Sequence, residues 1–396
     1  MRLQLIPIIL AVVINAAIDV YIYLKLKKSN KPKWMQRTHF GLSALLLIYI
    51  IVAVALPRRS IDNDGLRLIM WMLFSYFTFY VPKYFALIVA GLCNIPQLFK
   101  RKAPKCTSLI SCAVGIMLFV AMWWGALVTR SQYEVKEVTL EFSNLPYQFD
   151  GYRIAQISDI HLGTYGSDTT FMSKIVDKVN ELKPDLICFT GDIVNRQTDE
   201  AYPFKPVLSR LNATDGVLSI LGNHDYGDYR KWNSPEQREE NNRNLAIFEK
   251  ELGWNLMNNT DTIISRGENS ICIIGVENWG EPPFPKYGKL TEAHHNLNDS
   301  MFKILLSHNP SHWRSEVLPK SNIDLMLAGH THAMQMELDL FGLRLSPSKF
   351  KYNEWGGVYE QNGQMLYVNI GIGEVALPMR IGATPEITII TLKRKQ

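Results

Sequence analysis

The sequence is poor in cysteine, and this limits the kinds of site it can build. Five cysteines occur in 396 residues, and no two of them have the Cys-x-x-Cys spacing of a zinc-thiolate site or a redox pair. Cys188 and Cys272 stand inside strand-like runs, and the other three lie in or beside longer apolar segments. We therefore expect all five to be small, buried hydrophobic residues.

Acidic residues are nearly absent from the first third of the chain. Residues 1–132 carry 16 Lys and Arg against 3 Asp and Glu, whereas residues 133–396 carry 26 against 34. A basic segment that is also very apolar is typical of a membrane module beside anionic lipid. The acidic second part argues against a nucleic-acid partner, because phosphate contacts need a basic surface.

Four apolar stretches in the first part reach about the length that crosses a bilayer. They are residues 3–24, 40–56, 66–95 and 109–128. Pro82 lies inside the third, which predicts a kinked or broken span. A cleaved signal peptide is the alternative for the first stretch, but three further spans and only Arg2 before it disfavour that interpretation. We expect a four-helix transmembrane module over residues 1–132, followed by a second domain over residues 133–396.

The loops between these stretches predict the orientation of a multi-pass cell-membrane protein. Residues 25–38 contain six Lys and Arg, residues 100–105 contain four, and neither loop contains an acidic residue. Positive loops stay in the cytoplasm. With four spans, both termini and residues 133–396 are then expected to be extracytoplasmic.

Five short apolar runs in the second part each end at a residue type that binds metals. Each run is four to six residues long and reads as a buried strand. In layered α/β folds, functional side chains gather beyond the ends of such strands, so these residues are expected to converge. The runs are RIAQIS before Asp159 and His161, DLICFT before Asp192, VLSIL before Asn223, FKILLS before His308, and IDLMLA before His330 and His332.

This set of imidazole, carboxylate and amide ligands contains no thiolate. It suits divalent ions such as Mn, Fe, Zn or Co better than Ca. Seven ligands are too many for one ion but suit two that share a ligand. Two such ions activate a bridging hydroxide for attack on phosphorus and clamp the leaving oxygen. A single histidine at a strand end is more often structural, but the whole set is hard to explain by coincidence.

His224 follows Asn223 directly, so its side chain is expected to point over the site. It would then hold a phosphoryl oxygen or protonate the leaving alkoxide. Asp225 is expected to orient that imidazole.

These motifs resemble the five sequence blocks of the calcineurin-like metallophosphoesterase superfamily, over about residues 150–395. The blocks are Asp159-x-His161, Gly191-Asp192, Gly222-Asn223-His224-Asp225, His308 and Gly329-His330-x-His332. The segments SDIHLG, FTGDIV, LGNHDYG, NWG and PEITIITL are similar to the bacterial membrane-associated YkuE/YaeI-like branch.

The resemblance implies a fold, a ligand assignment and a catalytic histidine. The fold would be a four-layer α/β/β/α sandwich. One ion would be held by Asp159, His161, Asp192 and His332. The other would be held by Asp192, Asn223, His308 and His330, with Asp192 as the bridge and His224 as the catalytic histidine.

We therefore expect a membrane-anchored phosphoesterase that cleaves phosphoester or pyrophosphate bonds, with a lipid-linked molecule as one candidate substrate. An extracytoplasmic phosphodiesterase of soluble nucleotides is the alternative enzyme, and a non-catalytic membrane scaffold or sensor is the alternative of another class. The aromatic residues Tyr226, Trp279, Tyr352 and Trp355 either shape a substrate pocket or pack internally. The sequence leaves the substrate, the native metals and the oligomeric state open.

Overall fold

The computed structural model describes residues 5–282 and 284–395. Chain contacts divide the protein into two compact units, Met1–Trp123 and Trp124–Gln396. The division falls inside the fourth long helix, somewhat before the expected domain boundary at residues 132 and 133, which stays a prediction.

The first unit contains the predicted membrane helices. They are α1 (Leu5–Lys28), α2 (Lys33–Ala55), α3 (Asn63–Asn94) and α4 (Thr107–Leu127), whose last residues belong to the second unit. Four helices of the described chain are long and apolar enough to cross a membrane, as the sequence predicts. The expected break at Pro82 is absent, because α3 continues through this residue. A proline removes only one helical N–H, and membrane helices tolerate it.

Polar side chains inside this unit pair between α1 and α3. Lys83 Nζ lies 2.8 Å from Asp19 Oδ1, and the Tyr80 hydroxyl donates to Asp19 Oδ2 at 2.6 Å.

The expectation of buried cysteines is confirmed for Cys188 and Cys272 but is wrong for Cys106 and Cys112, which are exposed. An apolar membrane segment need not bury its side chains within the protein, because lipid can cover them.

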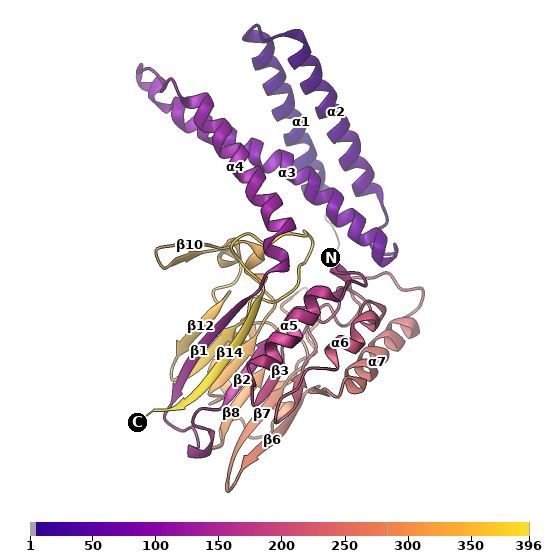
Figure 1. Cartoon of the computed structure of the whole chain (residues 1–396), viewed down its shortest axis with the longest axis vertical. Helices are drawn as coiled ribbons and strands as arrows, with labels where there is room; N and C mark the ends of the chain where they lie inside the picture. Colours follow the sequence, from indigo (N-terminus) through magenta and orange to yellow (C-terminus); the bar gives the residue numbers. More distant parts are fainter. Residues whose placement is uncertain (1–4, 283, 396) are drawn as a thin grey trace. The chain divides into compact units, whose positions relative to one another are not determined.

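The second unit contains two six-stranded mixed sheets (Figure 1). The first has the order β1-β14-β2-β3-β4-β5, and the second has the order β12-β13-β9-β8-β7-β6. The strands of the first sheet, in that order, are Glu134–Phe142, Glu386–Arg394, Arg153–Ile157, Leu186–Phe189, Val217–Ser219 and Asn255–Leu256. Those of the second sheet are Gly357–Gln361, Gln364–Val368, Leu325–Ala328, Phe302–Leu306, Asn269–Gly275 and Thr260–Arg266.

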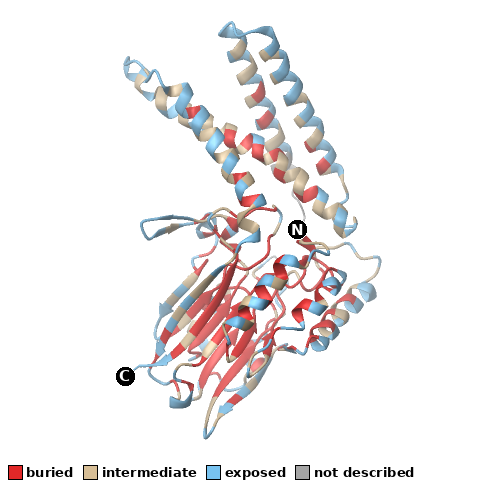
Figure 2. Ribbon diagram, viewed as in Figure 1, coloured by how far each residue is buried: buried red, intermediate tan, exposed pale blue. Residues whose placement is uncertain are grey.

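Alternating side chains of each sheet face two different cores, which gives four layers. In β2, Ile154 belongs to the core between the sheets, whereas Ala155 faces the core under helices α5 (Thr170–Glu181), α6 (Lys205–Leu208) and α7 (Pro235–Glu251). In β8, Ile304 faces the central core, and Leu305 faces a third core with Leu290 of α8 (Leu290–Ala293). Figure 2 shows the buried strands between their more exposed coverings. The expected α/β/β/α sandwich is confirmed.

The strands predicted before the motifs are also present, and they fix the site's position. β2, β3 and β4 pair in parallel, as do β8 and β9. Their carboxyl ends therefore lie at one end of each sheet, where the loops carrying the motif residues begin. β6 and β7 form an antiparallel hairpin, and Ser234 caps α7 by accepting a hydrogen bond from Gln237 N–H.

Candidate active site

The structure brings all seven predicted metal ligands together from loops after five different strands. Two groups of donor atoms form among these predicted ligands, and each group is compact enough to hold one ion. The first contains Asp159, His161 and His332, and the second contains Asp192, His308 and His330. The Asn223 side chain joins the second group, because its Oδ1 lies 3.2 Å from His308 Nε2.

Asp192 lies between the two groups. Its Oδ2 is 3.2 Å from His308 Nε2 and 3.6 Å from His161 Nε2. Asp159 belongs to the first group and also lies near the second. Its Oδ1 is 3.2 Å from His332 Nε2 and 4.0 Å from His308 Nε2. One carboxylate oxygen of Asp192 therefore faces ligands of both groups, which is the position that a shared ligand needs.

These ligands are held by unusual backbone. Asp159, His161, Asp192, His330 and His332 all have positive φ angles between 49° and 75°. Residues other than glycine rarely adopt this conformation, and such strain is concentrated at functional sites. The tight turns after the strands thus direct neighbouring side chains into one space rather than along the sheet faces.

Glycines make room for the approach of these turns. Gly191 has a φ of 97°, and a Cβ there would also lie 2.6 Å from Gly222 N. A Cβ on Gly222 would lie 2.2 Å from Asp192 Oδ1. The motif glycines are therefore required by space as well as by backbone conformation.

The distances between donor atoms fit bound divalent ions. His161 Nε2 and His332 Nε2 face each other at 3.1 Å, and His330 Nδ1 lies 3.3 Å from His308 Nε2. Ligands about 2.1 Å from a tetrahedral or octahedral ion stand roughly 3–3.4 Å from one another. Asp159, His161, Asp192, His308 and His332 are buried, and buried carboxylates next to imidazoles normally pair with a cation. The residues present therefore fit two metal ions.

The electrostatics of the second group agree with cation binding. Burial lowers the pKa of His308, but the carboxylates of Asp192 and Asp159 outweigh it and raise this pKa to about 10. For His330, burial together with the neighbouring His308 lowers the pKa to about 3. The two carboxylates thus favour positive charge at His308, where a bound cation would replace the proton.

His224 contacts one residue of each ligand group. Its backbone N–H donates to Asp192 Oδ1 at 2.8 Å, and its ring packs edge-on against His161 with centroids 4.8 Å apart. Nδ1 lies 2.6 Å from the Asn195 carbonyl oxygen, and the ring stacks on Tyr229. A hydrogen bond from Nδ1–H to that carbonyl leaves Nε2 available toward the site.

Asp225 does not have the role expected from the sequence. The orienting partner of the His224 ring is the carbonyl of Asn195, not the Asp225 carboxylate. Asp225 instead accepts hydrogen bonds from the backbone N–H groups of Asp192 and Gly222, both at 2.8 Å, and of Val194 at 3.2 Å. These backbone N–H groups have no strand partner, and the Asp225 carboxylate accepts from them instead. Asp225 thereby joins the loops after β3 and β4.

Three residues outside the five sequence motifs also contact the site. The Tyr352 hydroxyl lies 2.9 Å from His330 Nε2, and Asn223 Nδ2 donates to the Tyr229 hydroxyl at 2.8 Å. The buried Arg380 places Nη2 3.2 Å from His332 Nδ1 and donates to the carbonyls of Gly373 and Ala383. These contacts orient the side chains of the candidate ligands, and such partners fix the geometry of a metal site.

Of the four aromatic residues singled out in the sequence, only Tyr352 contacts a candidate ligand in the described hydrogen bonds and ring contacts. Tyr226 stacks on Tyr287, and Trp279 stacks on the buried His312. Trp355 lies in a small buried cluster with Tyr352. The other three take part in these internal packing contacts.

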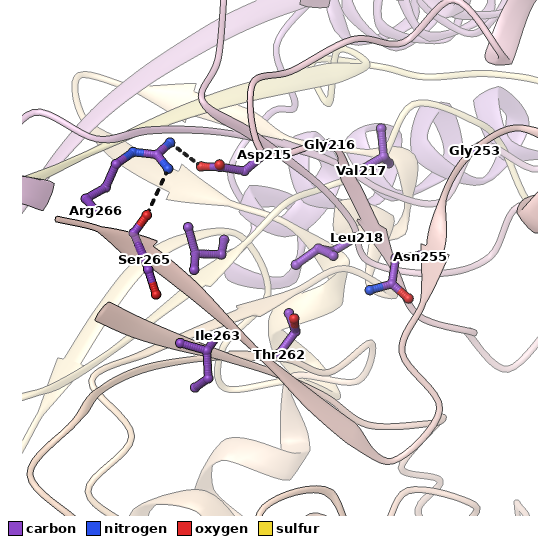
Figure 3. Close-up of a pocket in the computed structure, with 11 residues that line it drawn as sticks. Asp215, Gly216, Val217, Leu218, Gly253, Asn255, Thr262, Ile263, Ser265 and Arg266 are labelled. Carbon is purple, nitrogen blue, oxygen red and sulfur yellow. Dashed lines mark hydrogen bonds and ion pairs between the residues drawn. The ribbon is translucent and has the colours of Figure 1, made fainter. Parts of the chain in front are cut away.

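A separate cavity of about 380 Å³ lies at the opposite end of the first sheet (Figure 3). It is bordered by Val217 at the start of β4 and by β6, and Arg266 pairs with Asp215 across its rim at 2.5 Å. None of the predicted ligands lines it. It is therefore unrelated to the candidate metal centre.

Comparison with known proteins identifies the family. Residues 152–334 match the family described as "Calcineurin-like phosphoesterase", and residues 1–130 match "Probable Calcineurin-like phosphoesterase, transmembrane domain". The chain is 35% identical over 297 residues to "Uncharacterized metallophosphoesterase YkuE" of Bacillus subtilis, which covers 70% of this chain and 95% of that protein. The chain belongs to the calcineurin-like metallophosphoesterases.

Two further relatives also extend into the membrane part. "Transmembrane protein with metallophosphoesterase domain" of Danio rerio is 28% identical over 341 residues, covering 81% of this chain and 73% of its own. "Uncharacterized metallophosphoesterase Cj0846" of Campylobacter jejuni is 27% identical over 391 residues, covering 96% of each chain. The protein is therefore a membrane-associated phosphoesterase, a hydrolase of a metal-dependent family.

Proposed function

We propose that this protein uses two metal ions to hydrolyse phosphoester or pyrophosphate bonds at the membrane surface, with a lipid-linked molecule as its substrate. The observation that carries the proposal is the position of Asp192 Oδ2, which faces His308 of one ligand group and His161 of the other. A single-ion site needs no carboxylate shared in this way. Manganese is the proposed native metal, among the Mn, Fe, Zn and Co ions that this donor set accepts.

Each side chain then has a defined task. Asp159, His161, Asp192 and His332 would hold one ion, and Asp192, Asn223, His308 and His330 would hold the other. When bound, the ions supply a nucleophile at neutral pH and neutralise charge on the phosphoryl oxygens. His224, oriented by the Asn195 carbonyl, would hold a phosphoryl oxygen or deliver a proton to the leaving alkoxide from Nε2.

The membrane module supports a lipid-linked substrate. Four membrane helices confine the site to the neighbourhood of the bilayer, where a lipid substrate is concentrated and a soluble nucleotide is not. The basic loops at residues 25–38 and 100–105 favour an extracytoplasmic catalytic domain. A reporter fused to the C-terminus tests that orientation, and a cytoplasmic signal contradicts it.

A substrate screen with the full chain in detergent micelles and Mn²⁺ tests the function. Phosphorylated and pyrophosphate-linked lipids are compared with nucleotides, and bis-p-nitrophenyl phosphate reports the basic chemistry. The proposal expects the highest kcat/KM on a lipid. Preference for a nucleotide would favour the soluble-substrate alternative. A wild-type protein with no activity on any phosphoester would favour the scaffold, although a scaffold has no need of a complete ligand set.

A further inference from the structure

The segment that follows the last candidate metal ligand forms an exposed apolar hairpin. Strands β10 (Leu338–Leu340) and β11 (Leu343–Leu345) pair antiparallel, with Leu338 opposite Leu345 and Leu340 opposite Leu343. Directly opposite residues and residues two apart share one face of a hairpin. Four leucines therefore form one face, and all four are exposed by 40% or more. The other face carries Asp339 and Arg344.

The tip of this hairpin is an aromatic residue in a position that does not favour one. Phe341 and Gly342 form the two-residue turn, with φ angles of 55° and 87°. Asn, Asp or Gly is preferred at the first position of such a turn. Phe341 nonetheless occupies this position and is fully exposed. Its side chain therefore makes no packing contact within the domain that would offset the unfavourable backbone conformation.

A second exposed aromatic residue follows the hairpin. Phe350 is 97% exposed, and the exposed Lys349 and Lys351 stand on either side of it. An aromatic ring between two lysines is typical of a segment at the surface of an anionic bilayer, where the ring enters the lipid and the lysines face the headgroups.

Hydrogen bonds connect the base of the hairpin to the end of a membrane helix. Glu337 N–H donates to the Ile381 carbonyl at 2.8 Å, and Met336 forms a parallel bridge with Ile381. The neighbouring Arg380 N–H donates to the carbonyl of Gly125 at 3.2 Å. Gly125 lies in the last turns of α4, the part that belongs to the second unit. The backbone of Arg380 and Ile381 therefore links the base of the hairpin to the last turns of α4.

We propose that the β10–β11 hairpin, together with Phe350, inserts into the interface of the bilayer that α4 crosses. Lipid is the proposed occupant of the hairpin's apolar face. The base of the hairpin is fixed at the end of a membrane helix, and the neighbouring Lys349 and Lys351 match anionic headgroups. Figure 2 shows the hairpin as a largely exposed projection from the sheets. The inference goes beyond the proposed function, because it concerns a membrane contact that holds whatever the substrate is.

The same hairpin is linked to the metal site. Ser346 Oγ donates to the carbonyl of Ala333 at 2.6 Å, next to the ligand His332. Gln335 Nε2 donates to the carbonyls of Leu377 and Met379, which holds the segment between His332 and the hairpin in place. A hairpin seated in the interface would thereby keep the ligand loop at a set distance from the headgroups.

Site-directed spin labelling of the full chain tests the insertion. Cys93, Cys106 and Cys112 are changed to Ser, whereas the buried Cys188 and Cys272 are kept. A nitroxide is then attached through Phe341→Cys, and the protein is reconstituted in vesicles of equal parts phosphatidylcholine and phosphatidylglycerol. Collision rates with oxygen, which concentrates in lipid, and with a polar nickel chelate, which stays in water, report the surroundings of the label.

Tyr147 supplies the matched control. It is an aromatic residue that is 75% exposed, and it lies beyond the far end of β1. We expect the oxygen-to-nickel collision ratio to be severalfold higher at position 341 than at a label introduced by Tyr147→Cys. The elution profile of each labelled protein on gel filtration shows that it is folded. Phe350→Cys gives an independent site in case the turn variant is not folded.

Two results would overturn the proposal. A nickel-favoured ratio at position 341, equal to that at position 147, would place the hairpin in water. Low collision rates with both reagents would mean that protein covers the hairpin, either helices of the same chain or a second copy.

Discussion

The carboxylate of Asp225 accepts a hydrogen bond from the backbone N–H of Asp192 at 2.8 Å. Asp192 is the candidate bridging ligand, so Asp225, which follows the candidate catalytic residue His224, supports the candidate metal site and not the imidazole. Asp225 receives two further backbone N–H groups, and only a carboxylate accepts all three without introducing a competing donor.

Asp225→Asn is therefore expected to weaken metal binding. Its amide NH₂ would face a backbone N–H, so the loop carrying Asp192 shifts. The loss is expected to be about 10–100-fold in affinity for Mn²⁺, as for other residues that support ligands, and calorimetric titration measures it. Asp215→Asn, at the opposite end of the same sheet, is the control and should bind Mn²⁺ normally. Unchanged affinity with a reduced kcat in Asp225→Asn would restore the interpretation that Asp225 orients His224.

Tyr352→Phe tests the support of His330. The Tyr352 hydroxyl lies 2.9 Å from His330 Nε2, and its loss frees the ring that offers Nδ1 to the second ion. We expect about a tenfold weaker affinity for one ion and little change for the other. The change keeps the aromatic ring, so packing is preserved. Tyr147→Phe at an exposed position is the control, and equal affinities in the two variants would argue against the contact.

Gly222→Ala tests the close approach of the loops. The added Cβ would lie 2.2 Å from Asp192 Oδ1, so the carboxylate must move. A displacement of about 1 Å at a catalytic site lowers the rate on the order of 100-fold, and hydrolysis of bis-p-nitrophenyl phosphate measures it. Gly91→Ala in α3 has open space around its Cβ and should leave the rate unchanged. A wild-type rate in Gly222→Ala would show that the two loops do not approach each other so closely.

Glu249 predicts a pH-dependent stability away from the metal site. This carboxyl on α7 is buried, hydrogen-bonds with Ser219, and burial raises its pKa to about 7. Because the folded pKa exceeds the ordinary value of about 4.5, the stabilising proton is present in acid and is lost as the pH rises to about 7. The corresponding loss is on the order of 3 kcal/mol.

Glu249→Gln removes this titration. Its melting temperature in detergent micelles should exceed that of the wild type by several degrees at about pH 8 and match it at about pH 4. The control is Glu251→Gln, since Glu251 is exposed on the same helix. An equal difference between variant and wild type at both pH values would show that Glu249 does not titrate in this range.

The sequence predicted which candidate ligand residues come together, because their signal is local. An apolar run followed at once by Asp159 or His308 marks a strand end, and parallel pairing gathers such ends at one place. The four layers were expected from the resemblance to the family, and the structure shows them as a core on each side of β2 and β8.

Other parts of the site depend on contacts between distant loops. The partner of His224 is a backbone carbonyl at Asn195, which no side-chain pattern marks. Tyr352 reaches His330 through a loop after the hairpin, and Arg380 reaches His332 from the last loop of the domain. Asp225 was misassigned because adjacency in sequence suggested a contact that the tight turn prevents.

The number of ions that one chain binds decides whether Asp192 is shared between two metals. The full chain is stripped of metal, titrated with Mn²⁺, and followed by metal analysis and by hydrolysis of bis-p-nitrophenyl phosphate. We expect two ions per chain, activity that appears only when both are bound, and loss of both ions' tight binding and of hydrolysis in Asp192→Ala. Full activity with one ion per chain, or wild-type hydrolysis by Asp192→Ala, would contradict the two-metal site.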